Sequence, residues 1–198
     1  MISAILLSAG LSERFGSPKA LTKINETTRV IDAVQRTLLA SPINEIIVVL
    51  GAFAADIKPF LLKKKRIKSV LNKNYRKGQT SSFQTGLQHI SPSAEGILLL
   101  PIDYPAIKAE TIHILCDQFL NRDSLKIIIP SFKDHKGHPP IFPIHLKEEF
   151  LALDSSQGIN IVAQRHEKTT TIYPVDDPGV IQTFNTPQEF EQLKKTLV

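Results

Sequence analysis

Apolar residues gather along this chain in short, near-continuous runs of strand length. They cover residues 2–7, 46–50, 97–100 and 127–129. A near-continuous apolar run is typical of a strand that is buried on both faces, as in a parallel sheet. We therefore expect four such strands at the centre of the fold.

Between these runs, apolar residues recur with the spacing of amphipathic helices. The stripes comprise Val30, Ile31, Val34 and Leu38, then Phe83, Leu87 and Ile90, then Ile112, Leu115 and Phe119, and finally Phe190, Leu193 and Leu197. Thr27 or Thr28 is placed to cap the first helix. The segment Thr186–Glu189 predicts the start of the last helix, because it combines a capping box with proline at the first helical position.

Strands that alternate with helices predict an α/β protein with a doubly wound sheet and right-handed crossovers. The C-terminal third is less regular, since prolines interrupt it at positions 139, 140, 143 and 174. We expect a small β-rich insertion or lid there. A length of 198 residues suits a single domain over residues 1–198.

Composition places the chain among soluble globular proteins, with 42% hydrophobic and 22% charged residues. No apolar run approaches the ~20 residues of a membrane span, so we expect no membrane partner. The apolar start leads directly into polar sequence at Ser8, which favours a first strand over a signal peptide. The single cysteine, Cys116, cannot form an internal disulfide, and we expect it to be a small buried side chain in a cytoplasmic protein.

The net charge of +5 comes largely from one basic run, residues 63–68. No aromatic side chain interleaves with these cations, which favours a solvated loop or helix end over a nucleic-acid surface. We therefore expect no nucleic-acid partner. Mild basicity also suits a protein whose ligands are polyphosphates.

The segment LSAGLSERFGSPK, residues 7–19, directly follows the first predicted strand. In an open parallel sheet, ligands bind beyond the carboxyl ends of the strands. Gly10 and its small neighbours allow backbone N–H groups to approach phosphate oxygens, Arg14 offers a forked donor, and Lys19 offers a point charge. The order of residues matches neither the Gly-x-Gly-x-x-Gly nor the Walker pattern.

The pattern Leu7-x-Ala9-Gly10-x-Ser12-x-Arg14-Phe15-Gly16-x-x-Lys19 resembles the signature of molybdenum-cofactor nucleotidyltransferases, and most closely that of the cytidylyltransferase branch. Segments 77–82, 100–105 and 137–140 resemble three further motifs of that family, in the same order. The resemblance spans nearly the whole chain. It implies a Rossmann-like nucleotidyltransferase fold, with three layers around a mostly parallel sheet.

The resemblance also implies an activity, in which CMP passes from CTP to the terminal phosphate of molybdopterin and pyrophosphate is released, with Mg²⁺ as the cofactor. It implies catalytic roles for Arg14, Lys19 and Asp103. The implied substrate contacts are Leu7, Ser8, Ala9, Gly10, Ser12, Arg14, Lys19, Gly78, Thr80, Ser81, Ser82 and His138. The acceptor phosphate carries about −1.5 to −2 charge at neutral pH and needs no protein base. The chemistry requires charge cancellation and alignment of two anions.

The predicted metal ligands are Asp103 and Asn185. Asp103 follows the third apolar run, where a carboxylate reaches Mg²⁺ held mostly by phosphate oxygens; an ordinary turn aspartate is the alternative. Asn185 stands where the cytidylyltransferase pattern has aspartate, and Asn-Thr-Pro is similar to the guanylyltransferase branch. His138 lies either beside the acceptor or in a structural loop.

Ala9 favours CTP, because the guanine-using branch typically has glycine there and a methyl group narrows the space for the base. The alternatives are a guanylyltransferase, a sugar- or polyol-phosphate nucleotidyltransferase, or a non-catalytic NTP-binding accessory protein. A transient contact with a molybdenum enzyme stays open. An RNA-binding module is disfavoured, because the chain shows no stacking-aromatic motif.

Overall fold

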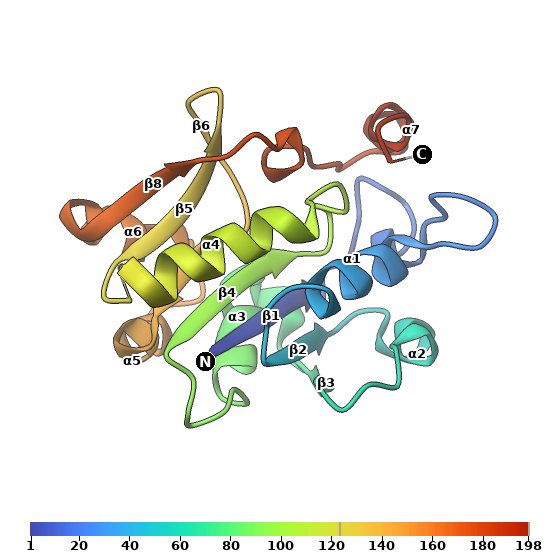
Figure 1. Cartoon of the computed structure of the whole chain (residues 1–198). Helices are drawn as coiled ribbons and strands as arrows, with labels where there is room; N and C mark the ends of the chain where they lie inside the picture. The colour runs from blue at the N-terminus through green and yellow to red at the C-terminus, as the bar shows by residue number, and fades with distance from the viewer. Residues whose placement is uncertain (123, 198) are drawn as a thin grey trace.

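The computed structural model describes residues 1–122 and 124–197 and is built around one eight-stranded sheet (Figure 1). The strands are β1 Ile2–Ser8, β2 Glu45–Leu50, β3 Ile67–Leu71, β4 Gly96–Pro101, β5 Ile127–Phe132, β6 His135–Lys136, β7 Ile141–Pro143 and β8 Thr170–Pro174. The α-helices are α1 Val30–Leu39, α2 Ala54–Ile57, α3 Gln79–Leu87, α4 Ala109–Arg122, α5 Lys147–Leu151, α6 Asn160–Arg165 and α7 Pro187–Lys194.

The strands follow the order β3-β2-β1-β4-β7-β5-β6, and β8 pairs with β5. The first four strands of this order run parallel, with Leu6 of β1 opposite Val48 of β2 and Leu100 of β4. Strand β7 is antiparallel to both β4 and β5. The carboxyl ends of β1, β2, β3 and β4 therefore meet at one edge of the sheet, where ligands bind in folds of this class.

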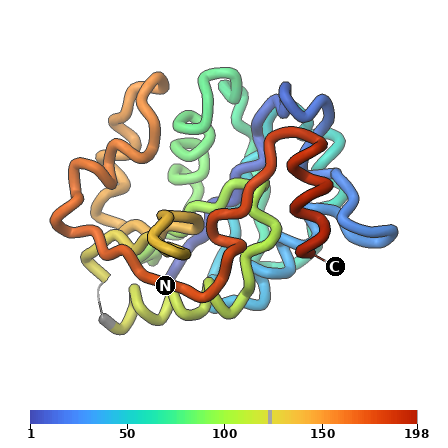
Figure 2. The backbone as a smooth tube through the Cα atoms, turned by 90° about the horizontal axis from the view of Figure 1, so that it is seen from above, coloured from blue at the N-terminus to red at the C-terminus, as the bar shows by residue number. Residues whose placement is uncertain are grey.

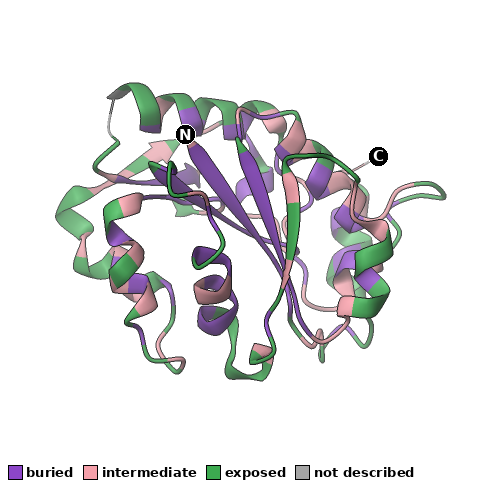
Figure 3. Ribbon diagram, turned by 90° about the horizontal axis from the view of Figure 1, so that it is seen from below, coloured by how far each residue is buried: buried purple, intermediate pink, exposed green. Residues whose placement is uncertain are grey.

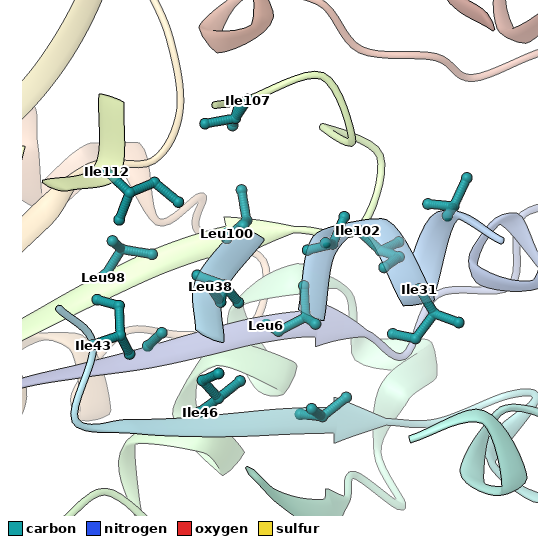
Figure 4. Packing of buried hydrophobic residues seen from close by; sticks show 14 of the residues in the cluster. Leu6, Ile31, Leu38, Ile43, Ile46, Leu98, Leu100, Ile102, Ile107 and Ile112 are labelled. Atoms are coloured by element: carbon teal, nitrogen blue, oxygen red, sulfur yellow. The ribbon is translucent and has the colours of Figure 1, made fainter. Parts of the chain in front are cut away.

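Helices cover both faces of the sheet, because the central strands bury side chains on both faces (Figure 3). On one face, α1, α4 and α7 pack over alternate residues of β1, β2 and β4, and Figure 4 shows Leu6, Ile46 and Leu98 within this layer. On the other face, α3, α5 and α6 pack around Ile5 and Phe83. Burying each such side chain contributes about 1.5–3 kcal/mol, so the two apolar layers fix the sheet between them.

The predicted strands and helices are present with small shifts of their ends, and the α/β doubly wound architecture is confirmed. The cap of α1 differs from the prediction. Neither Thr27 nor Thr28 caps this helix; its N-cap is Arg29, whose N–H donates to the Asp32 carboxylate at 2.9 Å. Thr28 instead closes a turn in which the Asn25 side chain accepts its N–H. The capping box of α7 forms as predicted, with Thr186 and Glu189 bonding to each other's backbone.

The C-terminal third contributes β structure as expected, but these strands join the central sheet itself. Strand β7 lies between β4 and β5, and β8 extends the sheet beside β5. Strand β3 was not predicted, because it lies at the edge of the sheet and exposes Lys68 and Ser69.

The structure also places the single cysteine and the basic run that the composition pointed out. Cys116 is fully buried, and burial, followed by the charge of Asp117, raises the pKa of its thiol to about 12. Residues 63–65 of the basic run form an exposed loop before β3, at the opposite end of the strand from the ligand-binding edge. Within residues 1–122 and 124–197, no helix has the length and apolar character that a membrane span requires.

Candidate active site

The loop after β1 is shaped to present its backbone to a ligand. Ser12 adopts a left-handed conformation with φ of +52°, and its carbonyl accepts the N–H groups of Phe15 and Gly16, each at 2.9 Å. Among the described residues, the N–H groups of residues 10–14 donate to no other group of the chain. A run of free backbone donors at the end of a buried strand is suited to bind an anion.

This loop forms one wall of a cavity of about 740 Å³, which we call the first cavity. The predicted site residues that line it are Leu7, Ser8, Ala9, Gly10, Ser12, Arg14, Lys19, Gly78, Ser82, Asp103 and Asn185. The sequence positions of these residues span almost the whole chain. Parallel strand order brings them together at one edge of the sheet, as the sequence predicted.

Four of the side chains that line the first cavity, Arg14, Lys19, Asp103 and Asn185, form one connected cluster. The Lys19 Nζ atom lies 3.0 Å from Asp103 Oδ2 and 3.0 Å from Asn185 Oδ1. Arg14 Nη2 donates to the same Asn185 Oδ1 at 2.9 Å. The cluster thus holds two cations, one carboxylate and one amide, which suits an anionic ligand.

An aromatic core brings Asn185 to the loop although the two are far apart in sequence. Phe15 packs edge-on against Phe184 and Phe190, with ring centroids 5.4 and 6.1 Å apart. Lys19 Nζ also lies 5.3 Å from the centroid of the Phe184 ring. Figure 2 shows α7, in red, beside the blue N-terminal loop. The last helix is therefore part of the site's framework.

A further part of the first cavity's wall is formed by Tyr75 and Arg76, from the turn Tyr75–Lys77, and by the start of α3. Gly78 joins them with φ of +98°, a conformation that side-chain-bearing residues rarely adopt. Gly86 allows α3 to lie close to the sheet, because a Cβ there would come within 2.5 Å of Ile5 Cγ2. Gly78 thus marks the start of α3, and Gly86 sets how closely the helix approaches the sheet.

Two of the predicted nucleotide contacts do not line the first cavity. Thr80 is buried and donates to the Gln157 carbonyl at 2.5 Å. Ser81 donates to the carbonyls of Asn74 and Gly78, each at 3.0 Å. Their hydroxyls bond to neighbouring loops, and the nucleotide contacts expected of these two residues stay a prediction; Ser82, one residue on, does line the cavity.

A second cavity, of about 730 Å³, adjoins the first. Gln79 lines both, and Tyr104 of the second cavity follows Asp103 of the first in sequence. Most of the second cavity's wall is apolar or aromatic, and its charged lining residues are Lys136 and Glu167. The apolar and aromatic lining residues are Leu99, Tyr104, Ile129, Pro140, Phe142, Ile159, Ala163 and Ile172.

His138 lies in the second cavity, against the Tyr104 ring at a centroid distance of 4.5 Å. Burial lowers the pKa of His138 below its ordinary value, so the ring is neutral at pH 7. Burial, followed by the charge of Asp103, raises the pKa of Tyr104, which keeps its hydroxyl protonated. The pair therefore offers an uncharged, aromatic surface.

Sequence reasoning missed several residues at the two cavities. Tyr75 and Arg76 line the first cavity from the turn before α3, and Gln79 lines it from the first position of α3, where no periodic pattern marks them. A further feature is visible only in three dimensions: among the described residues, the buried side-chain atoms without a hydrogen-bond partner are Ser8 Oγ and His138 Nδ1. One belongs to each cavity, and a buried polar atom without a partner is unusual enough to indicate a ligand-binding region.

Residues 4–170 match the family model described as "MobA-like NTP transferase domain". A "Probable molybdenum cofactor guanylyltransferase" from Bacillus mycoides is 27% identical over 76% of this chain and 72% of its own length. A "Nicotine blue oxidoreductase" from Paenarthrobacter nicotinovorans is 30% identical over 74% of this chain and 72% of its own length.

The fold is shared with Rv0371c from Mycobacterium tuberculosis H37Rv. Its crystal structure aligns with a TM-score of 0.84 and 23% identity over 98% of both chains. A structure of that protein in complex with manganese aligns with a TM-score of 0.80 and 22% identity, again over 98% of both chains. The match over residues 4–170, on a fold whose strand ends carry the predicted motifs, shows that the chain belongs to the MobA-like NTP transferase domain family.

Proposed function

We propose that this protein transfers a nucleoside monophosphate from an NTP to the terminal phosphate of molybdopterin, and releases pyrophosphate. The observation that carries the proposal is the pair of adjoining cavities. One is lined by free backbone donors, Arg14 and Lys19, and the other by apolar and aromatic side chains. Gln79 lines both, so a ligand in each would meet there.

In the proposed reaction, the first cavity holds the triphosphate. Backbone N–H groups of residues 10–14 donate to phosphate oxygens, and Arg14 and Lys19 balance the charge that builds up on pyrophosphate as it leaves. The acceptor phosphate is already anionic, and the residues of this chain act by placing it in line with the α-phosphorus.

The second cavity would bind the body of the acceptor. Tyr104 and His138 present a flat, uncharged surface, which suits a fused heterocycle such as a pterin.

Asp103 and Asn185 fit a divalent ion such as Mg²⁺, because both offer hard oxygen donors at the edge of the first cavity. Such an ion supplies further neutralisation of the phosphate charge when bound. Rv0371c, which shares this fold, has a structure in complex with manganese, and this supports the proposal of a divalent ion.

Two observations bear on which base the nucleotide carries, and they favour different bases. Ala9 is buried close to Gly51 and Tyr75. Its methyl group narrows the space for the base near the loop, which favours the smaller cytosine ring. The names of relatives favour guanine, since the Bacillus mycoides protein is named a guanylyltransferase. We propose CTP as the preferred donor, with GTP as the alternative that those names support.

One experiment tests the proposal directly. Purified protein is offered each of the four NTPs with Mg²⁺ against molybdopterin, a sugar phosphate and a polyol phosphate, and pyrophosphate release is measured. The expected result is release with molybdopterin and CTP, and less with GTP. Release only with a sugar or polyol phosphate would reassign the acceptor, and nucleotide binding without any release would indicate a non-catalytic NTP-binding protein.

A further inference from the structure

Lys19 occupies the place between the two oxygen donors that fit a divalent ion. Its ammonium group lies 3.0 Å from both Asp103 Oδ2 and Asn185 Oδ1, and the Lys19 and Asp103 side chains are only 12% and 20% exposed. A lysine ammonium held by two oxygens occupies their lone pairs as a metal ion would. The protein therefore already carries an internal cation at this position.

The charge of the surrounding cluster opposes a second cation. Arg14 and Lys19 together contribute two positive charges and Asp103 one negative charge, so the cluster has a formal charge of +1, and Arg14 shares the Asn185 amide oxygen at 2.9 Å. Over the described part of the chain, no group of three or more His, Cys, Asp or Glu residues is placed to hold a metal ion. A divalent ion approaching this cluster without nucleotide would meet a net positive charge and one carboxylate, that of Asp103.

We propose that Asn185 and Lys19 make divalent-ion binding conditional on nucleotide. The triphosphate, with several negative charges, draws Lys19 and Arg14 away from Asp103 and Asn185 and frees both oxygens for the ion. The inference rests on the proposed function only in that the first cavity takes a nucleoside triphosphate.

Asn185 is the determinant in this arrangement. An aspartate at this position would add a second carboxylate and bring the formal charge of the cluster from +1 to zero, since two negative charges would then face Arg14 and Lys19. Two carboxylates would then attract an ion even without nucleotide. The amide keeps the cluster positive, so the ion and the triphosphate enter together.

The proposal is tested by measuring Mn²⁺ binding to the full chain. Bound Mn²⁺ is measured as the loss of the electron paramagnetic resonance signal of free Mn²⁺. Titrations are run without nucleotide and with non-hydrolysable CTP and GTP analogues. We expect weak binding to the unmodified protein alone, and binding about tenfold or more tighter with an analogue. Asn185→Asp and Lys19→Met should each raise Mn²⁺ affinity without nucleotide by about tenfold or more. Lys64→Met, in the exposed loop before β3, is the matched control and should change nothing.

The inference is overturned if the unmodified protein binds Mn²⁺ without nucleotide as tightly as Asn185→Asp and Lys19→Met do. It is also overturned if an analogue binds but leaves Mn²⁺ affinity unchanged. Calorimetric titration of the analogues against the protein distinguishes a failure of this inference from a failure of the proposed function. If neither analogue binds, the proposed function fails, while the nucleotide-free comparison of the two variants with the unmodified protein still decides whether Asn185 and Lys19 hold the ion out.

Discussion

The two adjoining cavities have nearly the same volume, about 740 and 730 Å³, but opposite surfaces. The first is lined by a backbone loop and by charged side chains that bond to each other, Lys19 to Asp103 among them. The second is lined mainly by apolar and aromatic groups, with a neutral histidine. This difference suits the first cavity to bind charged phosphate groups and the second to recognise the shape of an apolar or aromatic group.

The comparison predicts that a substitution in one cavity changes the kinetic constants for one substrate and leaves those for the other substrate unchanged. Electrostatic changes in the first cavity should reduce turnover strongly, because charge is what the reaction must balance. Changes in the second should alter acceptor affinity modestly, because a single aromatic contact contributes about 0.5–1.5 kcal/mol.

The largest effect is expected for Asp103→Asn. The substitution keeps the shape but removes the only carboxylate of the Lys19 cluster, so pyrophosphate release should fall by at least about a hundredfold. Titrating Mg²⁺ in the assay should show half-saturation at much higher concentration. Asp134→Asn, in the exposed turn between β5 and β6, is the control and should retain normal turnover. Near-normal activity of Asp103→Asn at low Mg²⁺ would contradict the role of Asp103.

Lys19→Ala should have the next largest effect. A hydrogen bond to a charged group contributes about 1.5–3 kcal/mol, so kcat/KM for the nucleotide should fall about ten- to 150-fold. The KM for the acceptor should stay the same, since Lys19 lines only the first cavity. Circular dichroism checks that the variant is folded, and Lys64→Ala serves as the exposed control. An unchanged kcat/KM would exclude the loop from the mechanism.

Tyr104→Ala should affect the other substrate. Loss of the ring beside His138 should raise the KM for the acceptor about two- to twelvefold, and leave the KM for the nucleotide unchanged. Tyr104→Phe is the matched control, because it keeps the ring and removes only the hydroxyl that bonds with Thr183. A rise in nucleotide KM instead would show that the two cavities do not divide the substrates as proposed.

The first cavity could be predicted largely from sequence because its main loop is contiguous. Residues 7–19 follow a strand whose run of apolar residues is unmistakable, and parallel pairing places Asp103 at the same edge. The bonds that Thr80 and Ser81 make to carbonyl groups of the chain could not be predicted, because a hydroxyl that faces a ligand and one that bonds a carbonyl look alike in sequence.

The second cavity could not be predicted, because its wall comes from segments that lie apart in the chain. Strand β7 enters between β4 and β5 in an antiparallel sense, and the residues 158–172 that close the cavity carry no strong periodic pattern. Of its lining residues, only His138 was singled out, through its Gly-His-Pro segment. Strand order, which depends on long-range packing, decides which of these segments meet.

The smallest expected effect concerns the base, where Ala9→Gly acts through packing. Ala9 is 3% exposed, and a Cβ built on Gly51 would come within 2.8 Å of both its methyl group and Tyr75 Cβ, so Ala9 and Tyr75, which both line the first cavity, lie against Gly51. The unmodified protein should prefer CTP over GTP by about tenfold, or ~1.4 kcal/mol. Without the methyl group, Tyr75 gains room to shift, and that preference should fall about threefold, or ~0.6 kcal/mol.

Calorimetric titration of CTP and GTP with Mg²⁺ measures this preference. Ala94→Gly removes a methyl group from the same apolar layer but outside both cavities, and should leave the ratio of the two affinities unchanged. GTP binding as tightly as CTP to the unmodified protein would refute the cytidine preference and favour the guanylyl transfer named for the Bacillus mycoides relative. An equal loss of preference in both alanine variants would instead trace the effect to general loosening of the core, because only Ala9 touches the wall that the base would face.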